Sequence, residues 1–349
     1  MGRTTFSNED WRVARLLAEP LLDQPVAQAL QKVPEGASPA VVACLQHILQ
    51  AASEQKTIFG RLESGRLFRG LLGVIGQSGQ CLDGYELEEL VALGGLSAIY
   101  RGHHQDRPEQ PVAIKLLNPD YSGDLAHRLY RQERDALQTL RHPNVIRLLD
   151  SNDFPKNGGY LVLEYLHDVQ PLDEYARKYR QRPEKLVTLL LAVAETMAYV
   201  HARGVIHNDL KATNILIDPK YSVKIIDFGI AQSRPVRQGG RGESLGYTPY
   251  IAALEQIKGQ TITPQVDVFL LGATLLHVLT GQNPLPAFTP QSYSPANDER
   301  YVSQLLEKSD IDTTLKAIVR RALKTDCKQR YADMRALAEA LRCWLESHS

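Results

Sequence analysis

The spacing of apolar residues predicts helices in the first part of the chain. Residues 7–10 read Ser-Asn-Glu-Asp, which is typical of a helix start, and apolar side chains then recur every three or four positions. A Ser-Pro pair at 38–39 indicates the start of a second helix, and a shorter third helix is expected near residues 57–69. The glycine-rich stretch 70–84 has the composition of a linker. We therefore interpret residues 1–80 as a helical N-terminal region followed by a linker.

The pattern changes to that of β-strands at residue 85. Residues 85–91 and 98–102 alternate like the two strands of a hairpin, and residues 111–115 form a further strand. A helical pattern then covers about residues 122–140. This first mixed segment therefore predicts a small antiparallel sheet with one helix.

Helical spacing dominates the rest of the chain. After an apolar strand at residues 160–163, helices are predicted at about 171–179, 183–203 and 265–280. A last helix is expected to end near residue 345. The second part of the chain is therefore predicted to be mostly α-helical.

Composition and charge narrow the class of protein. The 349 residues suit two or three folding units, and 43% hydrophobic with 23% charged residues is ordinary for a globular protein. A formal net charge of zero gives no global attraction to nucleic acid or to a membrane surface. The four cysteines are scattered, so we expect a reducing compartment and no disulfide framework or zinc site. The chain lacks an apolar signal core and any uninterrupted apolar run of about 20 residues, so we expect a cytoplasmic protein with no membrane segment in this chain.

One polar loop concentrates the groups that phosphoryl transfer needs. A bend between two short apolar strands holds His207, Asp209, Lys211 and Asn214. A carboxylate can orient an attacking hydroxyl, a cation can neutralise a moving phosphoryl group, and an amide can help to hold Mg²⁺. A second strand follows and ends in an Asp-Phe-Gly turn that begins at Asp227. The pair of motifs predicts phosphoryl transfer from ATP.

A lysine at the end of a strand adds a further charged group. Lys115 ends an apolar strand, and such a lysine is costly to bury unless its ammonium group is paired. The following helix offers Glu133 as the partner. Two alternatives to such a buried pair stay open. Lys115 could lie at an exposed strand end, and Glu133 could belong, with Asp135, to a solvated face of its helix.

These motifs, in this order and separation, resemble those of protein kinases. Over about three-quarters of its length the chain looks like a eukaryotic-like (Hanks-type) Ser/Thr protein kinase of the kind common in bacteria. The resemblance implies an α+β, bilobal protein-kinase fold over residues 85–345, preceded by the helical N-terminal region. The small lobe, an antiparallel sheet plus one helix, would cover about residues 85–166. The larger helical lobe would cover about 167–345, with ATP in the cleft.

The resemblance also implies a role for each matching catalytic residue. Lys115 would hold the α- and β-phosphates of ATP, and Glu133 would orient it. Asp209 would position the substrate hydroxyl and accept its proton, while Lys211 would neutralise the transferring phosphoryl group.

ATP and Mg²⁺, with Mn²⁺ as a substitute, are the implied cofactors. Asn214 and Asp227 would bind the metal ion. The loop between the first two strands resembles the kinase glycine-rich loop, although Ala92 and Ser97 replace two of its three glycines. The implied ATP-binding residues are Val91, Ala92, Gly94, Gly95, Ser97, Ile99, Ala113, Lys115, Leu163, Glu164, Leu166 and Leu216.

Other matching positions have structural or regulatory roles in the family. Asn208 stands where most kinases have the arginine that receives a phosphorylated activation loop, so control through that phosphate is not expected. Asp267 would brace the backbone of the catalytic loop, and Glu255 would form a buried ion pair with Arg330. The remaining implied positions are Phe228, Gly229, Ser233, Ser244 and Thr248.

The predicted function is a Ser/Thr protein kinase in signal transduction that also phosphorylates itself. An ATP-binding pseudokinase or scaffold is an alternative, which the weak glycine loop favours and the intact catalytic residues oppose. A small-molecule kinase of the aminoglycoside or choline type is another, although such enzymes commonly lack a lysine at the position of Lys211. A P-loop nucleotidase is excluded, because its Gly-x-x-x-x-Gly-Lys-[Ser/Thr] motif does not occur.

The expected partners are protein substrates, with no nucleic acid. The helices of residues 1–80 have apolar faces that so small a unit must bury against something. We expect these helices to dock on the kinase domain, with an effect on activity, or to form a homodimer through the same faces.

Overall fold

The protein divides into two compact units, each described by itself below. The computed structural model describes residues 6–18, 21, 26–34, 36–59, 77–93, 97–117, 124–154, 158–228, 232–233, 251–285 and 295–348. The first unit comprises Met1–Arg134 and Leu148–Tyr165, and the second comprises Asp135–Arg147 and Leu166–Ser349.

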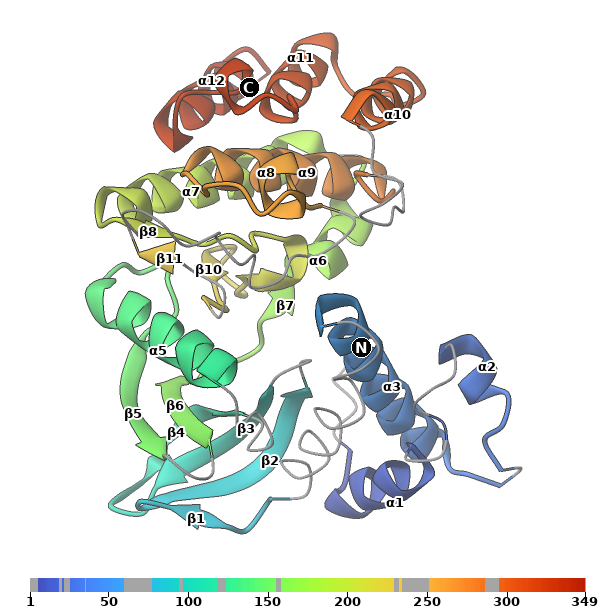
Figure 1. Ribbon diagram of the computed structural model, residues 1–349, viewed down its shortest axis with the longest axis vertical. Helices are drawn as coiled ribbons and strands as arrows, with labels where there is room; N and C mark the ends of the chain where they lie inside the picture. Colours follow the sequence, from blue (N-terminus) through green and yellow to red (C-terminus); the bar gives the residue numbers. More distant parts are fainter. Residues whose placement is uncertain are drawn as a thin grey trace. The chain divides into compact units, whose positions relative to one another are not determined.

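The first unit is built on a six-stranded antiparallel sheet with the order β1-β2-β3-β4-β6-β5 (Figure 1). Its strands are β1 (Cys81–Leu82), β2 (Tyr85–Leu93), β3 (Ser97–His104), β4 (Arg107–Leu117), β5 (Leu148–Phe154) and β6 (Gly158–Glu164), and the helix α5 (Asp124–Thr139) follows β4. The predicted strands are present but longer than their apolar patterns, because pairing continues past the last buried side chain. The first four residues of β4, for example, are exposed. β1 was not predicted, since two paired residues are too few to show a period.

Alternation along β4 separates the two faces of this sheet. Val112, Ile114 and Leu116 are buried on one face, and Ala113 and Lys115 belong to the other. The first three residues belong to one cluster of buried side chains that also includes residues of the N-terminal helices. These helices are α1 (Asn8–Ala18), α2 (Val26–Leu30) and α3 (Pro39–Phe59). Their apolar faces and the face of the sheet opposite Lys115 therefore share one core.

In the N-terminal region, α1 and α3 begin where the sequence predicted, and the structure differs from the prediction at two other places. α1 begins with a reciprocal cap, in which Asp10 N donates to Ser7 Oγ at 3.1 Å and Ser7 N donates to Asp10 Oδ2 at 2.9 Å. The short α2 was not predicted, because its five residues are too few to show a helical period. Residues 57–59 continue α3 and do not begin a third helix, and residues 60–76 lie outside the described part of the chain.

The second unit is mostly helical, as predicted. Its helices are α6 (Leu172–Tyr179), α7 (Pro183–Ala202), α8 (Leu254–Ile257), α9 (Gln265–Thr280), α10 (Pro295–Glu307), α11 (Thr313–Ala322) and α12 (Met334–Glu346), with 3₁₀ turns η2 (Ala212–Asn214) and η3 (Cys327–Gln329). Two small sheets of order β10-β9-β7 and β11-β8 are formed by β7 (Gln170–Pro171), β8 (Val205–Ile206), β9 (Ile215–Ile217), β10 (Val223–Ile225) and β11 (Gln232–Ser233). The polar loop lies between β8 and β9.

α9 is the most enclosed helix among the described elements of the second unit. Nearly all its residues are buried, as expected for a helix that is apolar on every side. It ends at Gly281, which has a φ of 72° and donates its N–H to His277 O at 2.7 Å. This left-handed φ, which residues with a side chain rarely adopt, is the reason that the helix end favours glycine.

α7 is long and apolar enough, by length and composition, to cross a membrane. However, 50% of its most apolar window is buried inside the protein, and the helix packs against α9 and α12. The core helix of a globular domain has these same properties, so α7 is weak evidence for a membrane span.

Candidate active site

Lys115 and Glu133 form a buried ion pair in the first unit. Lys115 Nζ, on β4, lies 2.7 Å from Glu133 Oε1 and 2.8 Å from Oε2, on α5. The two side chains are only 9% and 4% exposed. Burial of a charged group is costly, and an ion pair with a second buried group offsets part of this cost. The expected pairing is therefore present, and it holds the ammonium group at a defined place on the sheet.

Three of the residues implied for ATP binding lie on two neighbouring strands of the same sheet, β4 and β6. Ala113 belongs to the Lys115 face of β4 and pairs in register with Leu163 of β6. Leu163 is buried, and Glu164, the last residue of β6, is partly exposed. In the second unit, Leu216 is a partly exposed residue of β9.

The predicted phosphate-binding loop joins β2 to β3. Ala92 of β2 pairs with Ile99 of β3, next to an irregularity in the register. Ser97, which replaces the third glycine of the family pattern, is buried, whereas Val91 is exposed. The strands thus hold both ends of a hairpin.

Five predicted positions lie outside the described residues: Gly94, Gly95, Gly229, Ser244 and Thr248. Their implied roles stay predictions. Ser233 ends β11, where it pairs with Val205 of β8. Leu166, another of the implied ATP-binding residues, is partly exposed in the second unit.

Asp209 lies at the centre of the polar loop in the second unit. Its Oδ2 lies 3.0 Å from Lys211 Nζ and accepts a hydrogen bond of 3.1 Å from Asn214 Nδ2. The same Asn214 nitrogen donates to the backbone oxygen of Asp209 at 2.9 Å. A carboxylate, a cation and an amide are therefore brought together within one bend by contacts of the loop with itself.

His207 connects this loop to the Asp-Phe-Gly turn. Its Nδ1 accepts a hydrogen bond from Asp209 N at 3.3 Å, and its Nε2 lies 3.1 Å from the carbonyl oxygen of Ile226. These contacts assign the proton to Nε2, which donates to the carbonyl. The imidazole also contacts the ring of Phe228 at 4.6 Å between centroids, and both residues are fully buried.

Asp267 of α9 braces the loop backbone. Its Oδ2 accepts hydrogen bonds from His207 N at 2.9 Å and from His201 Nε2 at 2.7 Å, and its Oδ1 accepts one from Asn208 N at 2.8 Å. Complete burial would raise the pKa of Asp267, but the hydrogen bond and charge of His201 and the loop contacts hold this pKa below its ordinary value. The residue therefore acts as a buried carboxylate that receives backbone donors.

The buried ion pair expected between Glu255 and Arg330 is also present in the second unit. Arg330 Nη1 lies 2.6 Å from Glu255 Oε1, and Nη2 lies 2.9 Å from Oε2. This bidentate geometry is the strong form of the contact. It anchors α8 to the segment that follows α11.

Two residues that hold the loop were not predicted from the sequence. His201 donates to Asp267, and Gln256 Nε2 donates to the backbone oxygen of Asn208 at 2.9 Å. A histidine at the end of an apolar helix has no distinctive spacing. The only local signal for Gln256 was its place directly after Glu255.

Asn214 and Asp227 have the chemistry of Mg²⁺ ligands. Because Asn214 Nδ2 donates to Asp209, the amide oxygen Oδ1 is the atom left for a metal. Ile226 N donates to Asn214 O at 2.9 Å, which ties the residue before Asp227 to the same loop. Mg²⁺ is commonly bound by one or two such protein oxygens, with phosphates and water completing its shell. Over the described ranges, no group of three or more His, Cys, Asp or Glu side chains offers another metal site.

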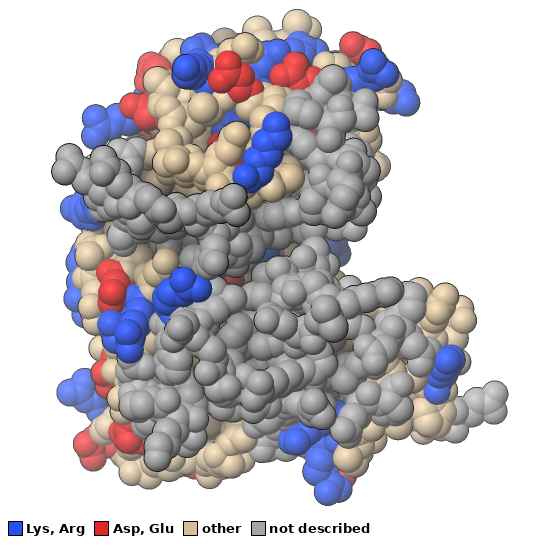
Figure 2. Space-filling model, viewed as in Figure 1, with Lys and Arg blue, Asp and Glu red and all other residues tan. Residues whose placement is uncertain are grey.

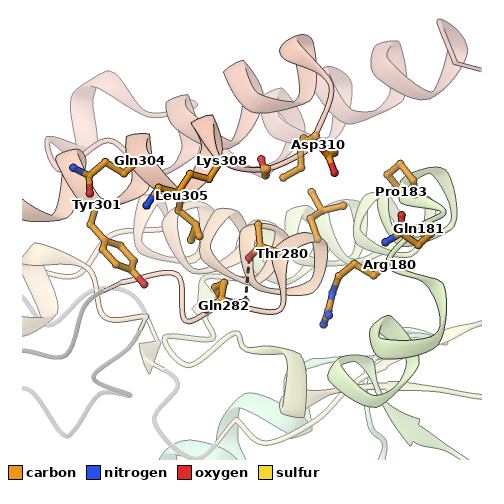
Figure 3. Close-up of a pocket in the computed structure, with 13 residues that line it drawn as sticks. Arg180, Gln181, Pro183, Thr280, Gln282, Tyr301, Gln304, Leu305, Lys308 and Asp310 are labelled. Carbon is orange, nitrogen blue, oxygen red and sulfur yellow. Dashed lines mark hydrogen bonds between the residues drawn. The ribbon is translucent and has the colours of Figure 1, made fainter.

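A cavity of about 670 Å³ lies in another part of the second unit (Figure 3). It is lined by the end of α9, by α10 and the loop after it, and by the link between α6 and α7. Within it, Gln282 N donates to Thr280 Oγ1 at 3.1 Å. Among the described residues, none of the predicted site positions lines this cavity, so it is not part of the candidate active site.

Surface charge on the face shown in Figure 2 is mixed. Lysine and arginine alternate with aspartate and glutamate there, most clearly over the C-terminal helices. Together with the net charge of zero, this pattern gives no extended field of one sign over the described part of that face.

Comparison with known proteins identifies relatives of the part of the chain that follows the N-terminal region and its linker. The protein kinase domain family matches residues 85–341. The chain is 29% identical over 267 residues to serine/threonine-protein kinase PknB of Mycobacterium tuberculosis strain H37Rv, an alignment that covers 73% of this chain and 42% of that protein. It is 30% identical over 268 residues to PknB of Mycobacterium leprae (73% and 42%) and 26% identical over 255 residues to a probable PknB of Lactococcus lactis (72% and 40%). The chain thus spans about two-fifths of the length of these curated relatives.

Proposed function

The chain belongs to the protein kinase family, as its motifs predicted, and we propose that it transfers the γ-phosphoryl group of ATP to serine and threonine hydroxyls of proteins. The observation that carries this proposal is the carboxylate of Asp209, which Lys211 and Asn214 hold within one loop. The names of the relatives support the choice of Ser/Thr kinase. Because those relatives are longer, the proposal concerns the chemistry of this chain's own residues.

In this mechanism Asp209 orients the substrate hydroxyl and accepts its proton. Lys211, whose ammonium group lies 3.0 Å from the Asp209 carboxylate, stabilises the negative charge of the phosphoryl group as it moves. Lys115, oriented by Glu133, holds the α- and β-phosphates. Catalysis then consists of positioning and electrostatic stabilisation, with little covalent work for the protein.

Asn214 and Asp227 are the residues that would hold the metal ion. When bound, Mg²⁺ neutralises charge on the β- and γ-phosphate oxygens of ATP. Asn214 donates through Nδ2 to Asp209 and would offer Oδ1 to the metal, so one side chain would link metal binding to the base.

Both alternative functions are less well supported than protein phosphorylation. A pseudokinase requires no aligned base and cation, whereas Lys115, Glu133, Asp209 and Lys211 all make the contacts that catalysis needs. The Lys211–Asp209 contact likewise favours a protein kinase over a small-molecule kinase.

Incubation of the purified chain with labelled ATP, Mg²⁺ and a generic protein acceptor tests the proposal. Asp209→Asn should lower kcat by at least about a hundredfold, the usual contribution of a positioned base, without changing the melting temperature. Asp310→Asn removes an exposed carboxylate of the same unit and should leave turnover unchanged. Near-native turnover in Asp209→Asn would contradict the role of this base. Phosphotyrosine as the main product would contradict the Ser/Thr assignment.

We also propose that the N-terminal helices are a fixed part of the kinase and affect its activity. The buried core that α1 and α3 share with β4 supports docking over free movement. Homodimerisation through the same helices is the alternative. The expected cytoplasmic location of the chain stays a prediction from its sequence.

A further inference from the structure

Asn208, the residue before Asp209, has an uncommon backbone conformation. Its φ is 66°, in the left-handed region, and the residue is 3% exposed. A non-glycine residue keeps such a conformation only where the surrounding contacts over-determine it. This conformation sets the direction in which the chain enters Asp209, so the contacts of Asn208 also position the candidate base.

Two buried side chains from different helices hold Asn208. Asp267 of α9 accepts the Asn208 N–H at 2.8 Å. Gln256 of α8 donates through Nε2 to Asn208 O at 2.9 Å and to Asn208 Oδ1 at 3.1 Å. The backbone donor, the backbone acceptor and the side-chain oxygen of Asn208 are therefore all engaged within the second unit.

Gln256 is itself held in one orientation. Its Oε1 accepts a hydrogen bond from Ala253 N at 2.9 Å, which places the oxygen toward α8 and the nitrogen toward Asn208. The residue is 2% exposed. Its neighbour Glu255 is paired with Arg330, so the short helix that presents Gln256 is anchored in the unit.

The contacts between Gln256 and Asn208 involve neutral groups only. They form without a phosphate or a counter-ion, because Gln256 donates through its neutral amide to two oxygens of Asn208. In a buried setting, removal of the Gln256 amide breaks both hydrogen bonds, which costs more than it would in water. These contacts can therefore hold the backbone before Asp209 without a phosphate group.

We propose that Gln256 is a positioning residue for phosphoryl transfer, which fixes Asp209 by way of Asn208. The inference rests on the proposed function, since it requires Asp209 to be the base. It goes beyond that function by naming the contact that holds the base in a protein with a neutral residue at position 208. Gln256 does not touch the substrate; it acts through the backbone that presents Asp209.

The first test replaces the amide by an apolar side chain of similar length. Gln256→Met should lower kcat about tenfold or more while KM for ATP changes less than about twofold, because Lys115 and Glu133 belong to the other unit. Gln260→Met changes an exposed glutamine four positions later and should match the unaltered chain. The melting temperature of each variant is measured as a control for folding. If Gln256→Met has a lower melting temperature than the unaltered chain, Gln256→Glu replaces it in the test, since glutamate keeps the shape of the side chain but lacks the donor toward Asn208.

A double-variant cycle separates positioning from a general loss of structure. If Gln256 acts through Asn208, the pair Asn208→Ala and Gln256→Met together should be no slower than the slower single variant, within about twofold. If the fold-losses in kcat of the two single variants multiply in the double variant, or if Gln256→Met has a normal kcat, this inference is wrong and the proposed function stays in place. Absence of turnover in the unaltered chain would overturn the proposed function, and this inference with it.

Discussion

At the scale of single residues, Arg330 is a buried cation whose hydrogen-bonding capacity is fully used. Its five N–H groups donate to the two oxygens of Glu255 and to the backbone oxygens of Lys324, Gln265 and Thr325. Its guanidinium also lies 4.8 Å from the ring of Phe269. The rigid fork of arginine suits this site, and lysine could not replace it.

Arg330→Met should destabilise the second unit strongly. The substitution leaves the buried Glu255 carboxylate without its partner, which typically costs about 3–5 kcal/mol in the free energy of unfolding. Urea unfolding followed by circular dichroism measures this loss. Arg335→Met, at an exposed position of α12, is the matched control and should change the free energy by less than about 0.5 kcal/mol. Equal unfolding midpoints for the two variants would contradict the assigned role of the ion pair.

At the scale of elements, β4 performs two tasks because its side chains alternate. One face contributes Ala113 and Lys115 to the candidate site, and the other contributes Ile114 to the core shared with α1 and α3. A perturbation of the N-terminal helices therefore acts on the strand that carries Lys115, the lysine proposed to hold the phosphates of ATP. This arrangement gives the proposed effect of residues 1–80 on activity a physical route.

Leu45→Ala should test this coupling, since Leu45 of α3 is fully buried in the shared core. We expect a loss of about 2–5 kcal/mol in the free energy of unfolding of the first unit and a parallel fall in activity. Leu16→Ala on α1 changes a leucine that is 66% exposed, and it should alter stability by less than about 0.5 kcal/mol.

Deletion of residues 1–75, with activity and mass measured, completes that test. If activity, solubility and oligomeric state all stay unchanged, both docking and dimerisation are wrong.

At the scale of the whole molecule, the two units carry different parts of the proposed catalytic machinery. The first unit provides a buried ion pair, Lys115 with Glu133, and the second provides the loop around Asp209. The second unit orders this loop through Asp267 and Gln256, a carboxylate and a neutral amide. None of these contacts involves a phosphate group, so we predict that phosphorylation is not needed to order this loop.

Phosphorylation of the chain should consequently change its activity by only a few-fold. A phosphate adds nearly two negative charges and orders a segment only where cations receive it, and Asn208 is neutral. Turnover of phosphatase-treated protein should be compared with that of fully autophosphorylated protein, with Ser233→Ala and Ser244→Ala as controls. A gain in turnover above about a hundredfold, worth roughly 2.7 kcal/mol of activation barrier, would show that another cation receives the phosphate in place of the arginine that most kinases have at position 208.

Local features account for the parts of the fold and site that were predictable. α9 has the predicted bounds because most of its residues are apolar and a glycine follows its last residue, and Asp209, Lys211 and Asn214 lie within six positions of one another. Short elements were missed, since β1 and α2 are too brief to show a period. Gln256 and His201 were missed for another reason: their partners lie 48 and 66 positions away, and neither residue carries a distinctive motif.

The sequence by itself determined the order of the elements, the family and the chemistry of the loop, because periodicity and short motifs depend on neighbours along the chain. Only the tertiary structure decided that the N-terminal helices share a core with the face of β4 opposite Lys115. It also decided that a neutral amide from α8 holds Asn208. Both features are contacts between distant segments through apolar or uncharged groups. The spacing of apolar groups predicts an element but does not identify its partner, and an uncharged amide has no distinctive motif, so their pairing is defined only when the chain has folded.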